Sequence, residues 1–196
     1  MDAISIEATK QLFTEARTYS AWSKKDVSEE TLRKIYELVK FGPTSANSCP
    51  ARFVFVKADS EKEKLISTLI PANVDKVRAA PVTAIVAMDE KFYEKIPKLY
   101  PPAPAYREVF SSNRELAEST SFRNSSLQGA YFIIAARAQG LDCGPMSGFD
   151  NKKLDEAFFS GTSWKSNFIC NVGYGDKTKL FPRLPRLTFE EACRIV

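Results

Sequence analysis

The sequence predicts an α+β fold, in which helices and strands are mixed without strict alternation. Apolar residues recur at helical spacing in several segments, of which the longest covers about residues 113–139. Val82–Met88 is apolar on both faces, as expected for a central strand. The sequence has neither GxGxxG after a strand nor GxxxxGKS/T, so a Rossmann or P-loop fold lacks its main support.

Length and composition are those of a globular protein. The 196 residues fit one domain, which we expect to span residues 1–196. Hydrophobic residues make up 44% of the chain and charged residues 27%. The net charge of +4 is spread along the chain without a basic run, so we expect neither nucleic acid nor a membrane as partner.

The cysteines and the N-terminal sequence predict a cytoplasmic protein with free thiols. No CxxC pair occurs, and MDAISIEATKQLF lacks the pattern of a secretory signal. The most apolar run, Leu127–Ala138, is far shorter than the roughly 20 residues that span a bilayer. The four cysteines are Cys49, Cys143, Cys170 and Cys193.

The chain contains no histidine. Ser-His-Asp and Cys-His catalytic arrangements are therefore excluded, as are zinc sites that need imidazole. We expect no metal site, and a bound organic cofactor is the economical way for such a chain to act as an enzyme.

Two helices are expected before the first strand. The first covers residues 5–16, where apolar side chains recur on one face. The second begins at Ser28, a good N-cap followed by two glutamates, and continues to Val39 before Gly42-Pro43 ends it. Phe53–Lys57 is a short β-branched and aromatic run, which is typical of a strand.

The middle of the chain is predicted to contain a helix, the central strand and a long loop. Ser60–Leu69 has the pattern of an amphipathic helix, and the strand Val82–Met88 follows it. Ile96–Tyr106 contains four of the eleven prolines. We expect this segment to be a surface excursion at the substrate entrance, neither helix interior nor central strand.

The long helix over 113–139 dominates the second half of the chain. Its second half is apolar almost all round, which favours a buried helix, and Gly140 ends it. Thr188 and Glu191 form a capping-box pattern at the start of the last helix. The other elements expected are a loop over 142–150, a helix over 152–159, a strand over 166–174 and a short helix over 188–195.

Four short segments rich in small, polar or basic residues follow one another along the chain: RTYSAW at 17–22, GPTSANSCP at 42–50, NVDK at 73–76 and GLDCGPMSGFD at 140–150. In this order they resemble the motifs of the nitroreductase-like family of FMN oxidoreductases. The resemblance covers nearly the whole chain and is closest to the malonic semialdehyde reductase branch, which forms 3-hydroxypropionate in pyrimidine catabolism. Taken singly, the first three have ordinary alternatives. RTYSAW also fits a helix end with a basic residue, GPTSANSCP a loop rich in turn-forming residues, and NVDK a helix with a solvated lysine.

The resemblance implies which side chains hold the FMN phosphate. Arg17 and Thr18 match the phosphate-binding positions, where guanidinium and hydroxyl donors suit a dianion. Ser20 lies where the family often has a lysine or arginine, so one charge is missing. Arg186 resembles the C-terminal phosphate arginine, and Arg183 is a second candidate.

The resemblance also implies which groups surround the flavin ring. The GPTSANSCP segment would supply short donors and acceptors to the flavin and ribityl hydroxyls, although Cys49 replaces the family's usual glutamine. NVDK would place a lysine at the pyrimidine edge, where a cation stabilises reduced flavin. The GPMSG loop would pass near flavin N5, with glycine allowing close backbone approach. The residues implied are Thr44, Ser45, Asn47, Asn73, Lys76, Pro145, Met146, Ser147 and Gly148.

The family fold implied is a three-layer α/β/α sandwich with a mostly antiparallel sheet. It forms an intertwined homodimer, with FMN at the subunit interface and the C-terminal segment reaching across. The mechanism implied is ping-pong: NADH or NADPH gives a hydride to flavin N5, and a small electrophilic substrate then accepts it. Neither hydride step requires a side-chain base, which agrees with the absence of histidine.

The resemblance implies reduction of malonic semialdehyde, whose carboxylate would need a cation. Arg123 is the candidate for that role, and an ordinary salt bridge on the helix is the alternative for this arginine. Two other functions remain open: a broad nitroaromatic or quinone reductase, and a protein that binds or senses flavin without turnover. A non-flavin interaction module fits four ordered segments poorly.

Overall fold

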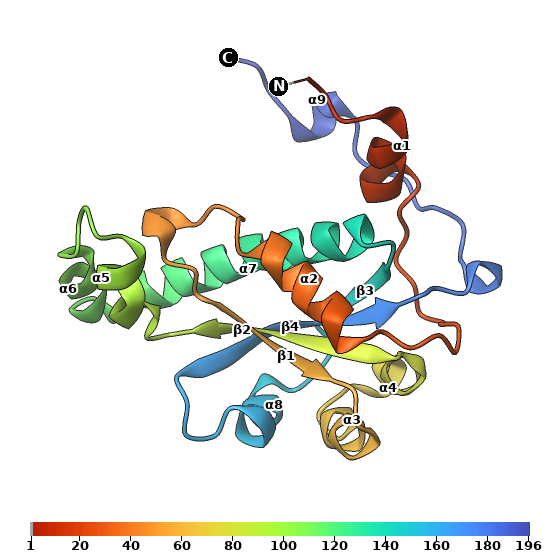
Figure 1. Cartoon of the computed structure of the whole chain (residues 1–196), viewed down its shortest axis with the longest axis horizontal. Helices are drawn as coiled ribbons and strands as arrows, with labels where there is room; N and C mark the ends of the chain where they lie inside the picture. The colour runs from red at the N-terminus through yellow and green to blue at the C-terminus, as the bar shows by residue number, and fades with distance from the viewer. Residues whose placement is uncertain (1) are drawn as a thin grey trace.

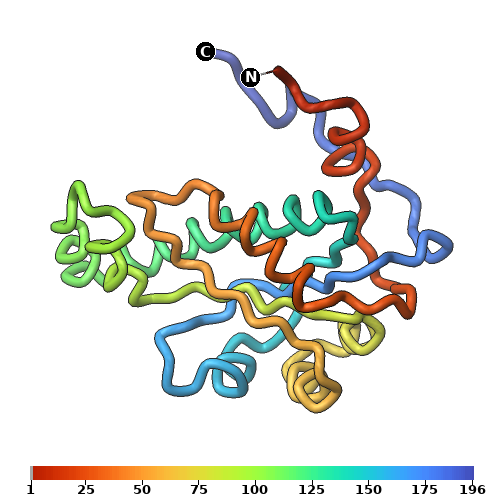
Figure 2. Tube along the Cα trace, in the orientation of Figure 1, coloured from red at the N-terminus to blue at the C-terminus, as the bar shows by residue number. Residues whose placement is uncertain are grey.

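The computed structural model describes residues 2–196 and has a four-stranded sheet between two layers of helices (Figures 1 and 2). The strands are β1 (Ala51–Val56), β2 (Val82–Asp89), β3 (Asp142–Met146) and β4 (Trp164–Gly173). Their order in the sheet is β1-β2-β4-β3, and every neighbouring pair is antiparallel. The α+β prediction and the layered antiparallel architecture are confirmed.

The register places the start of β1 and the start of β3 at opposite corners of the sheet. Ala51 on β1 pairs with Met88, near the end of β2. Cys143 on β3 pairs with Val172, and Val172 also pairs with Val82 at the start of β2. These corners are separated by the width of the sheet and nearly the full length of β2.

Two helices cover one face of the sheet and three cover the other (Figure 1). The first layer consists of α2 (Glu29–Val39) and α7 (Arg114–Ala138). The second layer consists of α3 (Asp59–Ile66), α4 (Pro71–Ala79) and α8 (Asn151–Phe158). Each layer has its own hydrophobic core against the sheet. Because β2 is buried on both faces, the prediction of an apolar central strand is confirmed.

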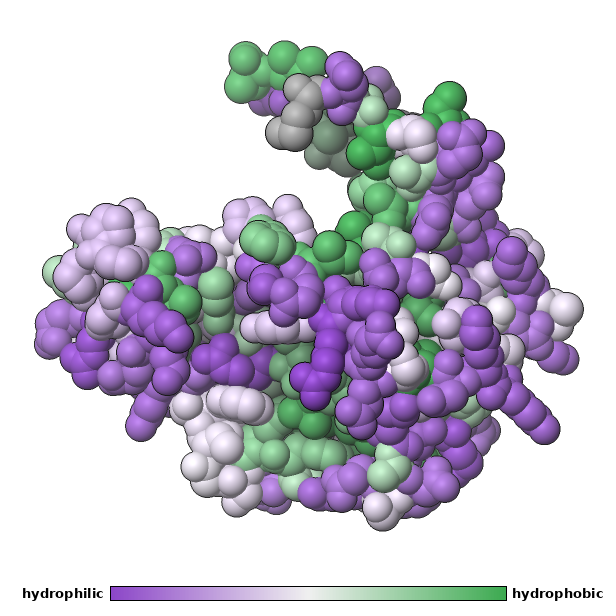
Figure 3. Space-filling view, viewed as in Figure 1, coloured by the Kyte–Doolittle hydropathy of each residue, from purple (hydrophilic) through white to green (hydrophobic). Residues whose placement is uncertain are grey.

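The two ends of the chain project together from the body (Figure 1). α1 (Ile6–Thr9) continues into a π-helical turn, η1 (Lys10–Thr14), so the predicted 5–16 helix ends two residues early. Its apolar residues are not buried, and Phe13 is 53% exposed. α9 (Phe189–Ala192) has the predicted capping box but is shorter than expected. Figure 3 shows hydrophobic residues at the C-terminal tip of this projection.

The expected surface excursion over Ile96–Tyr106 is largely exposed, but it begins with a short helix that was not predicted. A 3₁₀ turn, η3 (Phe92–Lys95), leads into α5 (Ile96–Leu99), and α6 (Tyr106–Ser111) follows. Pro97 lies in the first turn of α5, where the missing N–H costs no helical hydrogen bond. Ile96 is fully buried and anchors the segment.

Three further expectations need correction. The loop predicted over 142–150 begins with β3, because an edge strand tolerates a proline such as Pro145. α4 was not predicted. The apolar half of α7 is not buried on all sides, since Leu127 is 47% and Tyr131 43% exposed.

The remaining predicted elements are present with ends shifted by a few residues. All four cysteines are free, as expected. Among residues 2–196, no helix combines the length and the apolar character that crossing a bilayer requires.

Candidate active site

The RTYSAW segment lies against the outer edge of β3. Thr18 forms an isolated parallel bridge with Cys143, and the Tyr19 N–H donates to the Cys143 carbonyl at 3.0 Å. A Cβ atom at Gly144 would lie only 2.4 Å from the Tyr19 carbonyl oxygen, so this approach requires glycine. Arg17 and Thr18 are thereby placed beside the start of β3.

The NVDK segment contacts the loop that follows β3. Asn73, at the start of α4, donates through Nδ2 to the Gly148 carbonyl at 3.1 Å. The Lys76 ammonium donates to Asn73 Oδ1 at 3.1 Å. The Ile70 N–H also donates to the Gly148 carbonyl, at 3.1 Å. The structure therefore joins two of the four segments, with Lys76 oriented by Asn73.

The two candidate C-terminal arginines lie in different surroundings. Arg183 donates to the carbonyls of Thr14 and Ala16, at 2.8 and 3.1 Å. Arg17 in turn donates to the Phe181 carbonyl, so residues 181–183 run along the RTYSAW segment. Arg186 donates only to the carbonyls of Leu184 and Pro185, both at 3.0 Å. Arg183 is thus the one that lies next to Arg17.

The GPTSANSCP segment forms a strained loop between α2 and β1. Ser45–Asn47 is a single 3₁₀ turn, η2. Three non-glycine residues of the loop have positive φ: Ala46 at 50°, Asn47 at 45° and Cys49 at 40°. The Cys49 N–H donates to Thr44 Oγ1 at 3.1 Å, and Asn47 Nδ2 donates to the Leu99 carbonyl at 2.8 Å. We call residues 44–49 the 44–49 loop.

Within one chain, the 44–49 loop lies far from the groups along β3. The loop contacts α7 at Asn124, which accepts from the Ser45 N–H. The N-terminal segment contacts α7 at Arg137, which donates to the Leu12 carbonyl. These two points on α7 are about 20 Å apart at 1.5 Å per residue. The predicted site residues therefore form two groups, at opposite corners of the sheet.

Three residues that hold the 44–49 loop were missed by the sequence predictions. Asn124 accepts from the Ser45 N–H in the loop, Gln128 accepts from the Ala51 N–H at the start of β1, and Arg52 donates to the Cys49 carbonyl at 3.0 Å. Both amides lie in or just after the polar first half of α7, so no clear sequence signal marked their roles.

Tyr19 is a titratable group beside β3 whose pKa is clearly perturbed, and so is the buried Cys170 thiol, whose pKa is raised by its neighbour Cys143 and by burial. Burial raises the pKa of the Tyr19 phenol above the ordinary value of 10.0, and the nearby Asp142 carboxylate raises it further. The Arg17 guanidinium acts in the opposite direction. The Tyr19 side chain is only 6% exposed and packs against Gly175.

Arg123 lies on the exposed face of α7. Among the ion pairs formed by residues 2–196, none includes this arginine. The alternative of a salt bridge within the helix thus has no support in this part of the chain.

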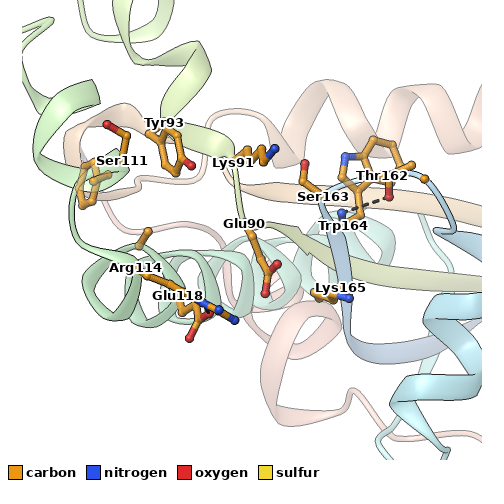
Figure 4. A pocket seen from close by; sticks show the side chains of 13 residues that line it. Glu90, Lys91, Tyr93, Ser111, Arg114, Glu118, Thr162, Ser163, Trp164 and Lys165 are labelled. Carbon is orange, nitrogen blue, oxygen red and sulfur yellow. Dashed lines mark hydrogen bonds and ion pairs between the residues drawn. The ribbon is translucent and has the colours of Figure 1, made fainter.

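Two cavities lie away from the predicted residues. One, of about 790 Å³, lies between the end of β2 and the start of α7 and mixes acidic and basic side chains, among them Glu90, Arg114 and Lys165 (Figure 4). The other, of about 1090 Å³, follows the outer edge of β1. Neither cavity is lined by any residue predicted to bind FMN.

The residues along β3 fit the expected cofactor. Arg17, Arg183 and Thr18 supply the donors that a phosphate requires, and Lys76 supplies a cation for the ring. At Gly148 a Cβ atom would lie 2.6 Å from Asn73 Nδ2 and 2.5 Å from Ile70 Cδ1. Glycine at this position therefore lets Ile70 and Asn73 pack closely against the backbone of the GPMSG loop.

Comparisons with known proteins agree on one family. A model described as "Nitroreductase family" matches residues 14–174. A Bacillus subtilis protein assigned as a nitroreductase has a TM-score of 0.88 at 20% identity, over 98% of this chain and 100% of its own.

Two other solved structures have the same fold. An Exiguobacterium sibiricum protein, assigned as a nitroreductase and solved in complex with FMN, has a TM-score of 0.85 at 19% identity, over 100% of this chain and 99% of its own. A Staphylococcus epidermidis protein assigned as an NAD(P)H:FMN oxidoreductase has a TM-score of 0.83 at 18% identity, over 100% of this chain and 99% of its own.

Proposed function

Since this chain belongs to the nitroreductase family, and is therefore an FMN-dependent oxidoreductase that uses NADH or NADPH, we propose that it reduces malonic semialdehyde to 3-hydroxypropionate. The resemblance of its four ordered segments to the enzymes of that reaction supports the proposal. In this reduction the carbonyl carbon gains a hydride and the oxygen gains a proton. Bound FMN supplies the hydride that originates from the nicotinamide.

The contact between Asn73 and Gly148 is the observation that carries the flavin site. It joins the NVDK and GPMSG segments, which are 75 residues apart in sequence, and it orients the Lys76 ammonium. In this proposal, Lys76 stabilises negative charge at the pyrimidine edge of reduced flavin. In the same proposal, the backbone of Pro145–Gly148 would lie near the reactive edge of the ring.

The phosphate is proposed to lie between Arg17, Thr18 and Arg183. Bidentate guanidinium groups suit a phosphate dianion better than ammonium groups do. In the structure, the arginines donate to backbone carbonyls, which phosphate oxygens can replace as acceptors. The phosphate role falls to Arg183 and not to Arg186, which contacts only its own neighbours.

We propose that two copies of the chain complete each flavin site. Thr44, Ser45 and Asn47 lie beside Asn124 of α7, whereas Cys143 of β3 contacts α7 at Ile133, about 14 Å further along the helix. The two groups also lie at opposite corners of the sheet, so we propose that they do not contact the same ring within one chain. A two-fold arrangement would bring the 44–49 loop of one copy to the β3 group of another.

Exposed apolar side chains supply a surface for such a dimer. They lie on the outer face of α7, at the end of α2 and along the projecting termini (Figure 3). Large apolar side chains exposed in this number are typical of a protein that associates with another copy or partner. Its members include Phe13, Phe41, Leu116, Phe122, Leu127, Tyr131, Phe181 and Ile195.

Arg123 is the proposed partner of the substrate carboxylate. Its exposed guanidinium has no carboxylate partner among residues 2–196, and α7 also carries the contact with the 44–49 loop. Replacement by alanine should raise the KM for malonic semialdehyde about tenfold or more, as expected for loss of a charged hydrogen bond. A neutral quinone should be affected much less. An equal effect on both substrates would remove Arg123 from this role.

The experiment that tests the function is anaerobic flavin spectroscopy followed by turnover. FMN-loaded protein should lose its visible flavin absorbance on addition of NADH or NADPH and recover it on addition of malonic semialdehyde. Recovery with a neutral quinone at equal or higher efficiency would favour a broad nitroaromatic or quinone reductase. Bound flavin that is reduced only slowly would favour a flavin-binding or sensing protein.

A further inference from the structure

The 44–49 loop has a conformation that its own residues disfavour. Ala46, Asn47 and Cys49 have positive φ although none is glycine. Non-glycine residues are strained in this region and remain there only where the surrounding structure fixes them. Bonds within the loop restrain it in part, such as those from the Cys49 N–H to Thr44 Oγ1 and from the Ser48 N–H to the Ser45 carbonyl, and contacts from outside it add to them.

Two side chains of α7 bind the chain at the start of the loop and at the start of β1, two residues after the loop. The Ser45 N–H donates to Asn124 Oδ1 at 2.8 Å, and the Ala51 N–H donates to Gln128 Oε1 at 2.9 Å. Asn124 and Gln128 are one helical turn apart and are only 2% and 4% exposed. Since water has little access to these amides, the two bonds fix the loop to one rigid helix.

Arg52 holds the C-terminal end of the loop from the other side. Its Nη1 donates to the carbonyls of Cys49 and Ala51, at 3.0 and 2.9 Å. Its Nη2 donates to Asp89 Oδ2 at 2.7 Å, and Asp89 also accepts from Ser163 Oγ at 2.6 Å. The loop is thus fixed between α7 and the end of β2, with backbone donors and acceptors both satisfied.

We propose that Asn124 and Gln128 are positioning residues of the flavin site. They hold the 44–49 loop in its strained, flavin-binding conformation before FMN arrives. The inference rests on the proposed function, in which this loop contacts the flavin. When the binding-competent state is only partly populated, the apparent affinity falls by that fraction. Loss of one of these acceptors therefore weakens FMN binding, whereas FMN-saturated enzyme retains its turnover rate.

The test compares two matched substitutions on opposite faces of the sheet. Gln128→Leu removes from α7 the side-chain oxygen that accepts from the Ala51 N–H of β1. Asp155→Leu does the same on α8, where Asp155 Oδ1 accepts from the Ser166 N–H at 2.8 Å, away from the 44–49 loop. Gln128→Glu keeps an oxygen at the same reach. Gln128→Asn, one carbon shorter, is a milder second variant in case Gln128→Leu does not fold.

Three quantities are measured for each variant. Flavin fluorescence gives the FMN dissociation constant, and circular dichroism gives the melting temperature without FMN. Steady-state turnover of NADPH and a quinone at saturating FMN gives kcat. The FMN dissociation constant should rise about tenfold in Gln128→Leu and less in Gln128→Asn. It should stay within about twofold of the unsubstituted value in Gln128→Glu and Asp155→Leu, even though Asp155→Leu lowers the melting temperature. The kcat should change by less than about threefold in all four.

Unchanged FMN affinity in both Gln128→Leu and Gln128→Asn would overturn the positioning role. An equal loss of affinity in Asp155→Leu would also overturn it, because general destabilisation would then explain the effect. An unsubstituted protein that binds no FMN would overturn the proposed function, and this inference with it. The affinity of the unsubstituted protein therefore separates the two failures.

Discussion

Asn73 Nδ2 donates to the carbonyl oxygen of Gly148 at 3.1 Å, which joins two segments that lie 75 residues apart in sequence. The same side chain accepts from the Lys76 ammonium through Oδ1. One buried amide thus fixes both the glycine loop after β3 and the cation beside it. This arrangement makes the glycine, the amide and the lysine separately testable.

Gly148→Ala should destabilise the protein and weaken FMN binding. The new Cβ would lie 2.5 Å from Ile70 Cδ1 and 2.6 Å from Asn73 Nδ2, and such overpacking typically costs about 1–3 kcal/mol. Urea unfolding and FMN titration measure the two effects. Gly161→Ala is the control, because its φ of +77° adds strain but no atom lies within 4 Å. Normal FMN binding by Gly148→Ala would contradict close approach of this loop to the flavin.

Lys76→Met should make the two-electron reduction potential of bound FMN more negative. Removing a cation near the pyrimidine edge removes stabilisation of the reduced flavin, and about 1.4 kcal/mol corresponds to roughly 30 mV for two electrons. Anaerobic titration against a redox dye measures the shift. Lys34→Met, at an exposed position of α2, should leave the potential unchanged. Equal potentials for Lys76→Met and the unsubstituted protein would place Lys76 away from the ring.

Arg17→Ala should weaken binding of FMN more than binding of riboflavin. A hydrogen bond to a charged group contributes about 1.5–3 kcal/mol, so FMN affinity should fall roughly 10- to 100-fold. Riboflavin lacks the phosphate, and its affinity should change little. Arg107→Ala, which breaks an exposed pair with Glu94, is the matched control. A similar loss for both flavins would indicate that Arg17 supports the fold and does not bind phosphate.

Tyr19 should contribute a fall in stability at alkaline pH. Burial, with a smaller effect of Asp142, raises the pKa of its phenol above 10.0, so the folded state retains a proton that the unfolded chain loses. This contribution is fully present below pH 10 and is lost as the pH rises from 10 through the folded-state pKa. Tyr19→Phe should therefore lose less stability than the unsubstituted protein between about pH 9 and pH 11 in urea unfolding. Identical pH profiles would refute the raised pKa.

Local patterns predicted most elements of the fold. The apolar periodicity of α2 and α7, the double-faced β2 and the capping box at Thr188 each express a local rule, and each was found. β3 was missed because Gly144 and Pro145 suggest a loop unless the strand is known to lie at an edge.

The exposure of hydrophobic residues could not be predicted from periodicity alone. Phe13 and Tyr131 follow helical patterns, yet both are exposed in the chain. Periodicity shows that a face is apolar, but it does not show whether the same chain or another copy covers that face.

The candidate site was only partly predictable. Resemblance identified Asn73 and Gly148 separately, but only the fold shows that they touch. Gln128 gave a weak signal because an isolated glutamine on a helix has many ordinary explanations. Its role depends on Ala51, which is 77 residues away in sequence.

The central claim, that an FMN site is completed by two copies of the chain, can be tested by subunit complementation. Arg17→Ala impairs the β3 group and Asn47→Ala the 44–49 loop, so neither variant alone should reduce quinones well at limiting FMN. After unfolding and refolding of an equal mixture, half of the dimers should contain one intact site, and roughly a quarter of the unsubstituted activity should return. Activity no higher than the average of the two separately refolded variants would contradict a site shared between two copies.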